Sequence, residues 1–173
     1  MKTIVLKLKN SSYDIKVGEG IVNNTNLNLL KKKEVLVVFD DKLPENFINI
    51  LKKSLPSELL ALNFIGINAS EKNKSPETLN LIHTRLIKEK YSRDSILVGF
   101  GGGIVSDITG FAASTYQRGV DFILIPTTLL AQVDASVGGK TAINHPLGKN
   151  MIGSFHQPIL VVIDSLFLAT LPL

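Results

Sequence analysis

Five runs of apolar, often β-branched residues recur along the chain, and their order constrains the fold more than any other sequence feature. The run "EVLVVFD" is continuous rather than alternating, as expected for a strand that is covered on both faces. The runs lie at 34–40, 59–67, 95–100, 121–126 and 159–164. We therefore predict five buried strands.

The segments between these runs carry helical patterns. Pro44 opens a helix with Phe47, Ile48, Leu51 and Leu55 on its apolar face. Ser75-Pro76-Glu77 has the capping hydroxyl, first-turn proline and early acid of a helix start. The stripe that this second helix would bury consists of Leu79, Ile82, Leu86 and Ile87.

Two further helices are predicted at 104–116 and in 127–139, where Gly138 and Gly139 end the pattern. Strands that alternate with helices indicate right-handed βαβ units and a mostly parallel sheet. The N-terminal segments "TIVLKL" and "SYDIKV" predict a half-exposed β-hairpin. The expected fold class is thus α/β, a Rossmann-like, mostly parallel sheet flanked by helices, with an N-terminal β-hairpin.

Composition bounds the domain organisation and excludes several functions. The 173 residues suffice for one domain, 1–173, and no repeat or low-complexity linker divides it. No apolar run has the roughly 18 residues of a membrane helix, and Lys7 and Lys9 argue against a signal peptide. The chain has no cysteine, which excludes disulfides and is compatible with a cytoplasmic location.

Charge is unevenly distributed, although the net charge is only +4. The surplus of lysine and arginine before residue 100 is scattered and lacks interleaved aromatic residues, so nucleic-acid binding is not expected. After residue 100 the only basic side chains are Arg118, Lys140 and Lys149. A segment this poor in charge is expected to be buried or to line a cleft.

The run "SILVGF" continues into "GGGIVSD" (101–107), a strand, triple glycine and helix start of the kind that can hold a phosphate. The spacing departs from the common dinucleotide signature G-x-G-x-x-G, because Ser106 stands at the third glycine position. The acid at the usual distance, Asp121, begins a strand instead of ending one. The alternative is that the glycines form only a tight turn.

Two acids lie where they could meet a ligand. Asp107, expected in the first turn of the helix, would repel a phosphate but could hold a ribose or amide group. Asp40 ends the first buried run and either takes a ribose hydroxyl or is a plain turn acid beside Asp41.

The most specific stretch is 114–158, which concentrates six polar residues in a region otherwise almost free of charge: Arg118, Asp134, Lys140, Asn144, Lys149 and Asn150. Thr127 and Thr128 follow a strand end, where hydroxyls can bond a ligand or cap the next helix. Two lysines, an arginine and an asparagine in one cleft would suit a phosphorylated, carboxylated, polyhydroxylated substrate.

The segments "GGGIVSDITGFAASTYQRGV", "IPTTLLAQVDASVGGKTAIN" and "GKNMIGSFHQP" closely resemble 3-dehydroquinate synthases, the NAD-dependent cyclases of the shikimate pathway. The resemblance is dense over 95–173 and weaker before it. It implies an NAD-binding N-terminal domain in residues 1–173, followed in the family by a helical domain that lies beyond this chain. The segment "NASEKNKSPETL" is similar to the family pattern "DGExxKSxET", with Ser70 in place of its glycine.

The resemblance implies a set of cofactor-binding residues, to which position adds Asp40. These are Ala69, Ser70, Glu71, Lys72, Asn73 and Lys74; Gly101, Gly102, Gly103, Ile104, Val105, Ser106 and Asp107; Thr127 and Thr128; Lys140 and Lys149; and Phe167, Leu168, Ala169 and Thr170. Ser106 replaces a second family glycine.

The resemblance also implies that Arg118, Asp134, Lys140 and Asn150 act on a phosphorylated sugar acid, 3-deoxy-D-arabino-heptulosonate 7-phosphate. The implied reaction oxidises the C4 alcohol transiently, loses phosphate and closes the carbocycle, which makes the enzyme a phosphorus–oxygen lyase that contributes to chorismate and aromatic amino acid biosynthesis. Family members are expected to be homodimers.

The family's divalent metal, Zn or Co, would be held by ligands outside this chain. His83, His145 and His156 lack the spacing of metal ligands, and His83 lies on a helix with an apolar stripe.

Two alternatives stay open at this point. One is a related NAD(P)-dependent polyol or glycerol-phosphate dehydrogenase, against which "DASVGGKTAIN" argues. The other is a non-catalytic nucleotide-binding fragment, or one that assembles with a separately encoded C-terminal chain. Isolated residues 1–173 are expected to bind NAD but to be inactive.

Overall fold

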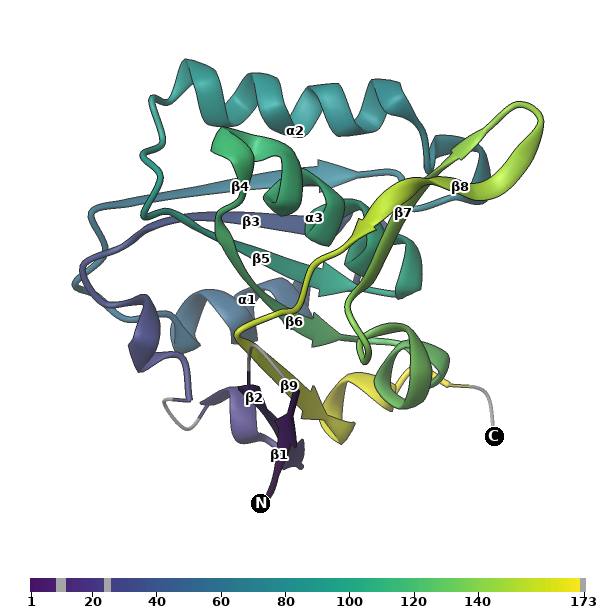
Figure 1. Cartoon of the computed structure of the whole chain (residues 1–173). Helices are drawn as coiled ribbons and strands as arrows, with labels where there is room; N and C mark the ends of the chain where they lie inside the picture. Colours follow the sequence, from purple (N-terminus) through teal and green to yellow (C-terminus); the bar gives the residue numbers. More distant parts are fainter. Residues whose placement is uncertain (9–11, 24–25, 172–173) are drawn as a thin grey trace.

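A seven-stranded sheet runs through the centre of the molecule, which is described here by a computed structural model covering residues 1–8, 12–23 and 26–171 (Figure 1). Its order is β1-β2-β9-β6-β5-β3-β4, and only the β1–β2 pair is antiparallel. The strands are β1 Lys2–Lys7, β2 Ser12–Gly18, β3 Glu34–Asp40, β4 Ala61–Ile67, β5 Ile96–Gly101, β6 Asp121–Pro126 and β9 Leu160–Asp164. The fold class and the N-terminal hairpin predicted from the sequence are confirmed.

The strand order creates a natural place for a ligand. Among the five predicted strands the order is β4-β3-β5-β6-β9, so the direction of winding reverses between β3 and β5. Doubly wound sheets bind ligands outside the carboxyl ends of the strands at such a reversal. Asp40 ends β3 and Gly101 ends β5 at this point.

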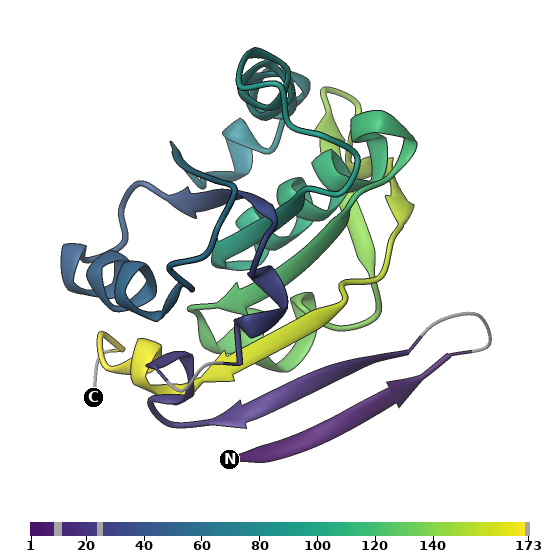
Figure 2. The same cartoon turned by 90° about the vertical axis from the view of Figure 1, so that its left-hand side faces the viewer.

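Three main helices cover the two faces of the sheet (Figure 2). They are α1 Glu45–Ser54, α2 Pro76–Lys88 and α3 Gly103–Thr115. The α1 helix packs its residues Phe47 and Leu51 into one buried cluster, whereas α2 and α3 contribute to the cluster on the opposite face. Adjacent β5 residues Leu97 and Val98 enter different clusters, because side chains alternate across a strand. The sheet is therefore buried on both faces.

A second, two-stranded sheet lies against α3 and was not predicted (Figure 1). It consists of β7 Lys140–His145 and β8 Gly148–Phe155, which pair antiparallel. Its sequence mixes lysines, asparagines and glycines with apolar residues and has no sustained alternation. We call these two strands the β7–β8 hairpin.

Short helical turns complete the chain: Ile21–Asn23, Asn28–Leu30, Glu71–Asn73, Tyr116–Arg118, the π-helical turn Ala131–Ala135, and Ser165–Leu168. None of the helices in the described part of the chain combines the length and apolar character needed to cross a bilayer.

Four details of the sequence-based prediction are wrong. The strand β4 lies at the sheet edge, so it is not fully buried, and Leu62 is 40% exposed. Ile87 is 66% exposed, because it lies about 100° around the α2 helix from the buried Leu86. The helix expected in 127–139 is reduced to a short segment ending before Ser136. Asp107 lies beyond the first turn of α3, since that helix already begins at Gly103.

Candidate functional site

The glycine turn leaves backbone donors free at the start of α3. Gly102 is the N-cap residue and provides no side-chain cap, and the first helical bond runs from the Ser106 N–H to the Gly102 carbonyl at 3.1 Å. The preceding N–H groups of the first turn thus have no carbonyl partner within the helix. A Cβ atom at Gly102 would lie 3.2 Å from Thr128 Cγ2, and one at Gly103 would lie 3.1 Å from Ala135 Cβ. The absence of side chains therefore lets this turn pack closely against residues 127–135, because a side chain at either glycine would crowd the narrow space between them.

Ser106, which stands where the resemblance implies a glycine, does not enter that space. Its side chain is on the buried side of α3, and Oγ donates back to the Gly102 carbonyl at 3.3 Å. A serine hydroxyl that bonds the preceding turn of its own helix adds no bulk to the open face of the glycine turn.

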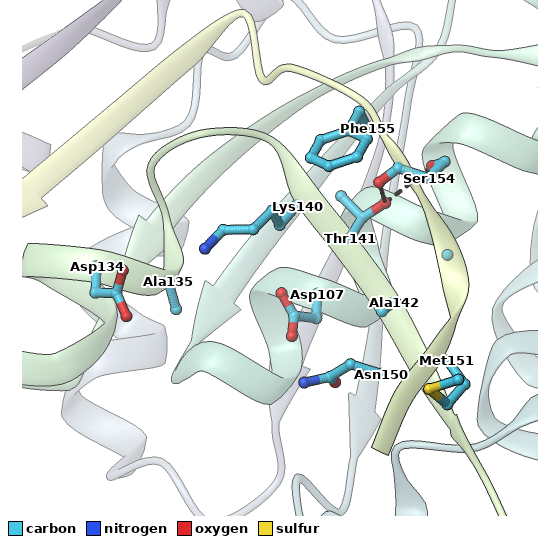
Figure 3. A pocket seen from close by; sticks show the side chains of 11 residues that line it. Asp107, Asp134, Ala135, Lys140, Thr141, Ala142, Asn150, Met151, Ser154 and Phe155 are labelled. Atoms are coloured by element: carbon cyan, nitrogen blue, oxygen red, sulfur yellow. Dashed lines mark hydrogen bonds between the residues drawn. The ribbon is translucent and has the colours of Figure 1, made fainter. Parts of the chain in front are cut away.

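A cavity of about 490 Å³ lies beside the glycine turn, between α3, the turn Ala131–Ala135 and the β7–β8 hairpin (Figure 3). Three of the four predicted substrate residues line it: Asp134, Lys140 and Asn150. Asp107 reaches the same cavity from α3. The remaining wall is formed by Ala135, Thr141, Ala142, Met151, Gly153, Ser154 and Phe155.

Lys140 extends from β7 into the space between Asp134 and Asp107 (Figure 3). Within residues 1–8, 12–23 and 26–171, no carboxylate lies within 4.0 Å of its ammonium nitrogen. This cation and the neighbouring Asp134 carboxylate are therefore available to a ligand.

The buried Lys74 side chain bonds two residues that line the cavity. The Lys74 side chain is only 5% exposed, and its Nζ donates to the Asp107 carboxylate and to Asn150 Oδ1. Burial raises the pKa of the Asp107 carboxyl above its ordinary value, and the hydrogen bond and charge of Lys74 oppose that shift. Asn150 Oδ1 is engaged by Lys74, whereas its Nδ2 group has no acceptor in the part of the chain that the structure describes and can donate to a ligand.

Polar contacts also join the hairpin to the segment that precedes α2. Asn144 Nδ2 donates to Glu71 Oε1 at 2.7 Å and to the Glu71 carbonyl at 3.1 Å. Lys149 Nζ lies 3.8 Å from Glu71 Oε1. The pKa of Glu71 is lowered, first by the hydrogen bond from Asn144 and, more weakly, by the nearby lysines. The segment 68–74, which carries six of the predicted cofactor residues, thus lies against β7 and β8.

The remaining polar candidates lie at the same edge of the sheet. Thr127 follows β6, and its N–H donates to the Gly101 carbonyl at 2.9 Å. Thr128 is exposed, and its Oγ1 accepts from the Ala131 N–H at 3.3 Å, which is a helix-capping bond. Asp40 Oδ1 accepts from the Lys42 N–H at 3.1 Å, as expected for a turn acid. Asp40 also ends β3, beside the point where the winding of the sheet reverses.

Two predicted groups lie away from the cavity. Arg118 belongs to the turn Tyr116–Arg118, which follows the carboxyl end of α3, whereas the glycine turn precedes the amino end. The Phe167 side chain is fully buried, with its ring centroid 5.1 Å from that of Phe47 and 5.0 Å from that of Phe100. In the segment 167–170, only the residues after Phe167 present side chains to solvent.

The histidines are engaged in structural contacts. His83 Nε2 lies 3.0 Å from Thr115 Oγ1, and His156 Nε2 lies 2.9 Å from the Val120 carbonyl. His145 Nδ1 accepts from the Leu147 N–H at 3.2 Å. In the part of the chain that the structure describes, no three histidine or carboxylate side chains are grouped as metal ligands, so these residues do not fit a metal site of their own.

Sequence reasoning missed the β7–β8 hairpin. It counted Asn144 among the polar residues of 114–158 but gave it no specific role. The available signal was the concentration of polar residues in 140–150 within a charge-poor region. Nothing local indicated that this stretch folds back onto residues 68–74.

Comparison with known families gives one extensive match. The model of the 3-dehydroquinate synthase N-terminal domain matches residues 64–173. The 3-dehydroquinate synthase of Blochmanniella pennsylvanica is 48% identical over 175 residues, which cover 99% of this chain and 48% of that protein. That of Shewanella frigidimarina is 45% identical, with the same coverage of both chains. The chain thus spans about half the length of the curated relatives it matches.

Solved structures agree on the architecture. A 2-epi-5-epi-valiolone synthase from Streptomyces hygroscopicus with NAD+ and Zn2+ bound superposes with a TM-score of 0.85 and 32% identity, covering 97% of this chain and 47% of that one. A 2-deoxy-scyllo-inosose synthase complexed with carbaglucose-6-phosphate, NAD+ and Co2+ has a TM-score of 0.91 at 22% identity, over 99% and 47% of the two chains. At that identity the second likeness concerns the fold alone.

Proposed function

Because the chain belongs to the 3-dehydroquinate synthase family, we propose that residues 1–173 form the NAD-binding domain of a 3-dehydroquinate synthase. The proposed reaction converts 3-deoxy-D-arabino-heptulosonate 7-phosphate to 3-dehydroquinate and phosphate. The observation that carries the proposal is the convergence of Asp134, Lys140 and Asn150 on one cavity beside the uncapped start of α3.

The glycine turn suits the pyrophosphate of NAD. Free N–H groups and the positive end of the α3 dipole attract an anion, and the three glycines allow close backbone approach. NAD, when bound there, would supply a hydride acceptor and return the hydride. The Asp107 carboxylate is held by Lys74, so its charge is largely balanced beside the anionic cofactor.

The cavity residues suit the phosphorylated sugar acid. The unpaired Lys140 ammonium can bind phosphate or carboxylate, and the Asn150 Nδ2 group can donate to a hydroxyl or phosphate oxygen. Asp134 can accept from a substrate hydroxyl and so orient it. These are binding and orienting roles. The described residues do not form a metal site, and no step of the proposal runs through a metal held by this chain.

Arg118 does not line this cavity in the single chain. Its predicted substrate role is a separate hypothesis. We also propose that the whole protein is a cytoplasmic homodimer, in which a C-terminal domain completes the enzyme. The metal ligands are assigned to that further domain.

Calorimetric titration of the 173-residue chain with NAD tests the cofactor site directly. We expect saturable binding that is lost in Gly102→Val, since the new side chain would occupy the space facing Thr128. Absence of binding by the wild-type chain would refute the cofactor assignment.

Phosphate release in the presence of the C-terminal half of the protein tests the substrate site. Lys140→Ala should lower the rate about 10- to 100-fold, as expected for loss of a charge-assisted contact. Lys88→Ala removes the same charge from the exposed surface of α2 and should leave the rate unchanged. Unchanged phosphate release by Lys140→Ala would contradict the substrate assignment, and substrate-dependent accumulation of NADH would instead favour a dehydrogenase.

A further inference from the structure

We propose that Asn144 is a positioning residue, which holds the β7–β8 hairpin on residues 68–74 and thereby fixes Lys74 and Asn150 relative to each other. Asn144 does not line the cavity, whereas Asn150 does. Only the roles of the two positioned residues rest on the proposed function, in which Lys74 binds the cofactor and Asn150 binds the substrate.

Asn144 uses both ends of its side-chain amide and its backbone N–H for this connection. Its Nδ2 donates to both the carbonyl and the Oε1 atom of Glu71, at 3.1 Å and 2.7 Å. Its Oδ1 accepts from the Asn150 N–H at 2.8 Å, and its own N–H donates to the Lys74 carbonyl at 2.8 Å. One residue of β7 is thus bonded to both ends of the segment 71–74 and to the facing strand.

An irregularity in the hairpin makes this arrangement possible. Ile143 pairs with Ile152 and His145 pairs with Gly148, so three β8 residues lie opposite Asn144 alone. A bulge of this kind releases backbone groups from the ladder and redirects side chains. Asn150, at the middle of the irregularity, has a left-handed φ of 56°, a conformation that asparagine tolerates better than most residues.

The contacts form a closed ring. Asn144 bonds Asn150, the Asn150 side chain accepts from Lys74, and the Lys74 carbonyl accepts from Asn144. Lys74 also pairs with Asp107 on α3, so the ring is anchored to the helix that follows the glycine turn. Without the Asn144 side chain, the Asn150 N–H loses its acceptor and Glu71 loses its donor.

Two other connections join these segments. The Lys74 side chain donates to Asn150 Oδ1, as the ring requires. Lys149 approaches Glu71 at 3.8 Å, but the two side chains are 73% and 49% exposed. Exposed ion pairs of this kind contribute little. Asn144 therefore makes three hydrogen bonds between the hairpin and segment 68–74, whereas Lys74 makes one.

Amide hydrogen exchange of the wild-type chain and of Asn144→Ala tests the proposal without any ligand. The Asn150 amide should exchange roughly tenfold faster in the variant, the effect expected for loss of about one hydrogen bond. The β5 amides serve as a folding reference and should keep their protection. Asn80→Ala, an exposed substitution on α2, should change neither. Unchanged exchange at Asn150 in the folded Asn144→Ala variant would overturn the proposal.

Asn144→Asp distinguishes the contact with Asn150 from the contact with Glu71. This variant remains informative if the alanine variant does not fold. Its carboxylate can still accept from the Asn150 N–H but repels Glu71, so Asn150 should stay protected. NAD titration should then show roughly tenfold weaker binding, and Glu71→Gln in the same chain should restore it by supplying a donor. Wild-type NAD affinity in Asn144→Asp, or no restoration in the double variant, would overturn the proposal. If the wild-type chain binds no NAD, the proposed function fails, whereas the exchange measurement still decides the role of Asn144.

Discussion

The central sheet and the β7–β8 hairpin are built by different means. Strands β3 and β5 are buried almost throughout, and their side chains enter apolar clusters on both faces of the sheet. Strand β8 is mostly exposed, and β7 contributes one side chain, Ile143, to an apolar cluster. The hairpin is otherwise held by close approach to α3 and by hydrogen bonds of Asn144 and Asn150. The sheet provides stability, whereas the hairpin provides two of the three predicted substrate residues in the cavity.

This difference implies that the two regions respond differently to substitution. Apolar burial across a whole sheet is cooperative, so damage there should unfold the domain. Polar contacts of a peripheral hairpin contribute about 1 kcal/mol each, so their loss should alter the site while the sheet remains folded.

The largest effect is expected for Leu97→Ala in β5. Leu97 is fully buried, and truncation of such a side chain leaves a cavity that costs about 3 kcal/mol in the free energy of unfolding. Chemical denaturation should show a single transition, at a lower denaturant concentration than in the wild-type chain, in which the sheet and the hairpin unfold together. Leu62→Ala on the exposed edge strand β4 is the matched control and should cost far less. Separate transitions for the sheet and the hairpin would contradict the cooperative role given to β5.

A smaller effect, about 1–2 kcal/mol, is expected for Gly110→Ala, which acts where the hairpin meets α3. A Cβ atom at Gly110 would overlap Thr141 Cγ2 on β7 and approach Phe122 at 3.1 Å. Amide exchange should therefore become faster in β7 and β8 than in β5.

Thr141→Ser is the compensating change for Gly110→Ala. It removes the Cγ2 atom that the new methyl group would meet but retains the hydroxyl that donates to the Ser154 carbonyl at 2.9 Å. Because alanine is about 1 kcal/mol more favourable than glycine inside a helix, the double variant should recover most of the loss. No recovery would show that contact with Phe122, rather than with β7, requires glycine here.

The smallest effect is expected from pH, through Glu71. Its pKa is lowered in the folded chain, so its ionised form adds stability at neutral pH that is lost as the pH falls through the folded pKa, below the ordinary 4.5. The protection factors of the hairpin amides, which correct for the pH dependence of intrinsic exchange, should fall below about pH 4.5 in the wild-type chain. In Glu71→Gln, which can still accept from Asn144, that fall should be smaller. Equal pH profiles would indicate that the Glu71 charge does not hold the hairpin.

The sequence by itself determined the sheet. Continuous apolar runs and helix-start signals act over a few neighbouring residues, so the limits of β3 and β6 follow directly from "EVLVVFD" and "DFILIP". The triple glycine likewise indicated a ligand-binding turn, because glycine is required wherever backbone must approach another group closely.

Only the tertiary structure decided how the site is assembled. The position of β4 at the edge, the buried Lys74–Asp107 pair and the contact of Asn144 with Glu71 join residues far apart in sequence. No local pattern encodes such pairs, since they depend on strand order and on where the hairpin packs. The separation of Arg118 from the cavity has the same origin: "STYQRGV" is close to the glycine turn in sequence, but the length of α3 places it at the other end of the helix.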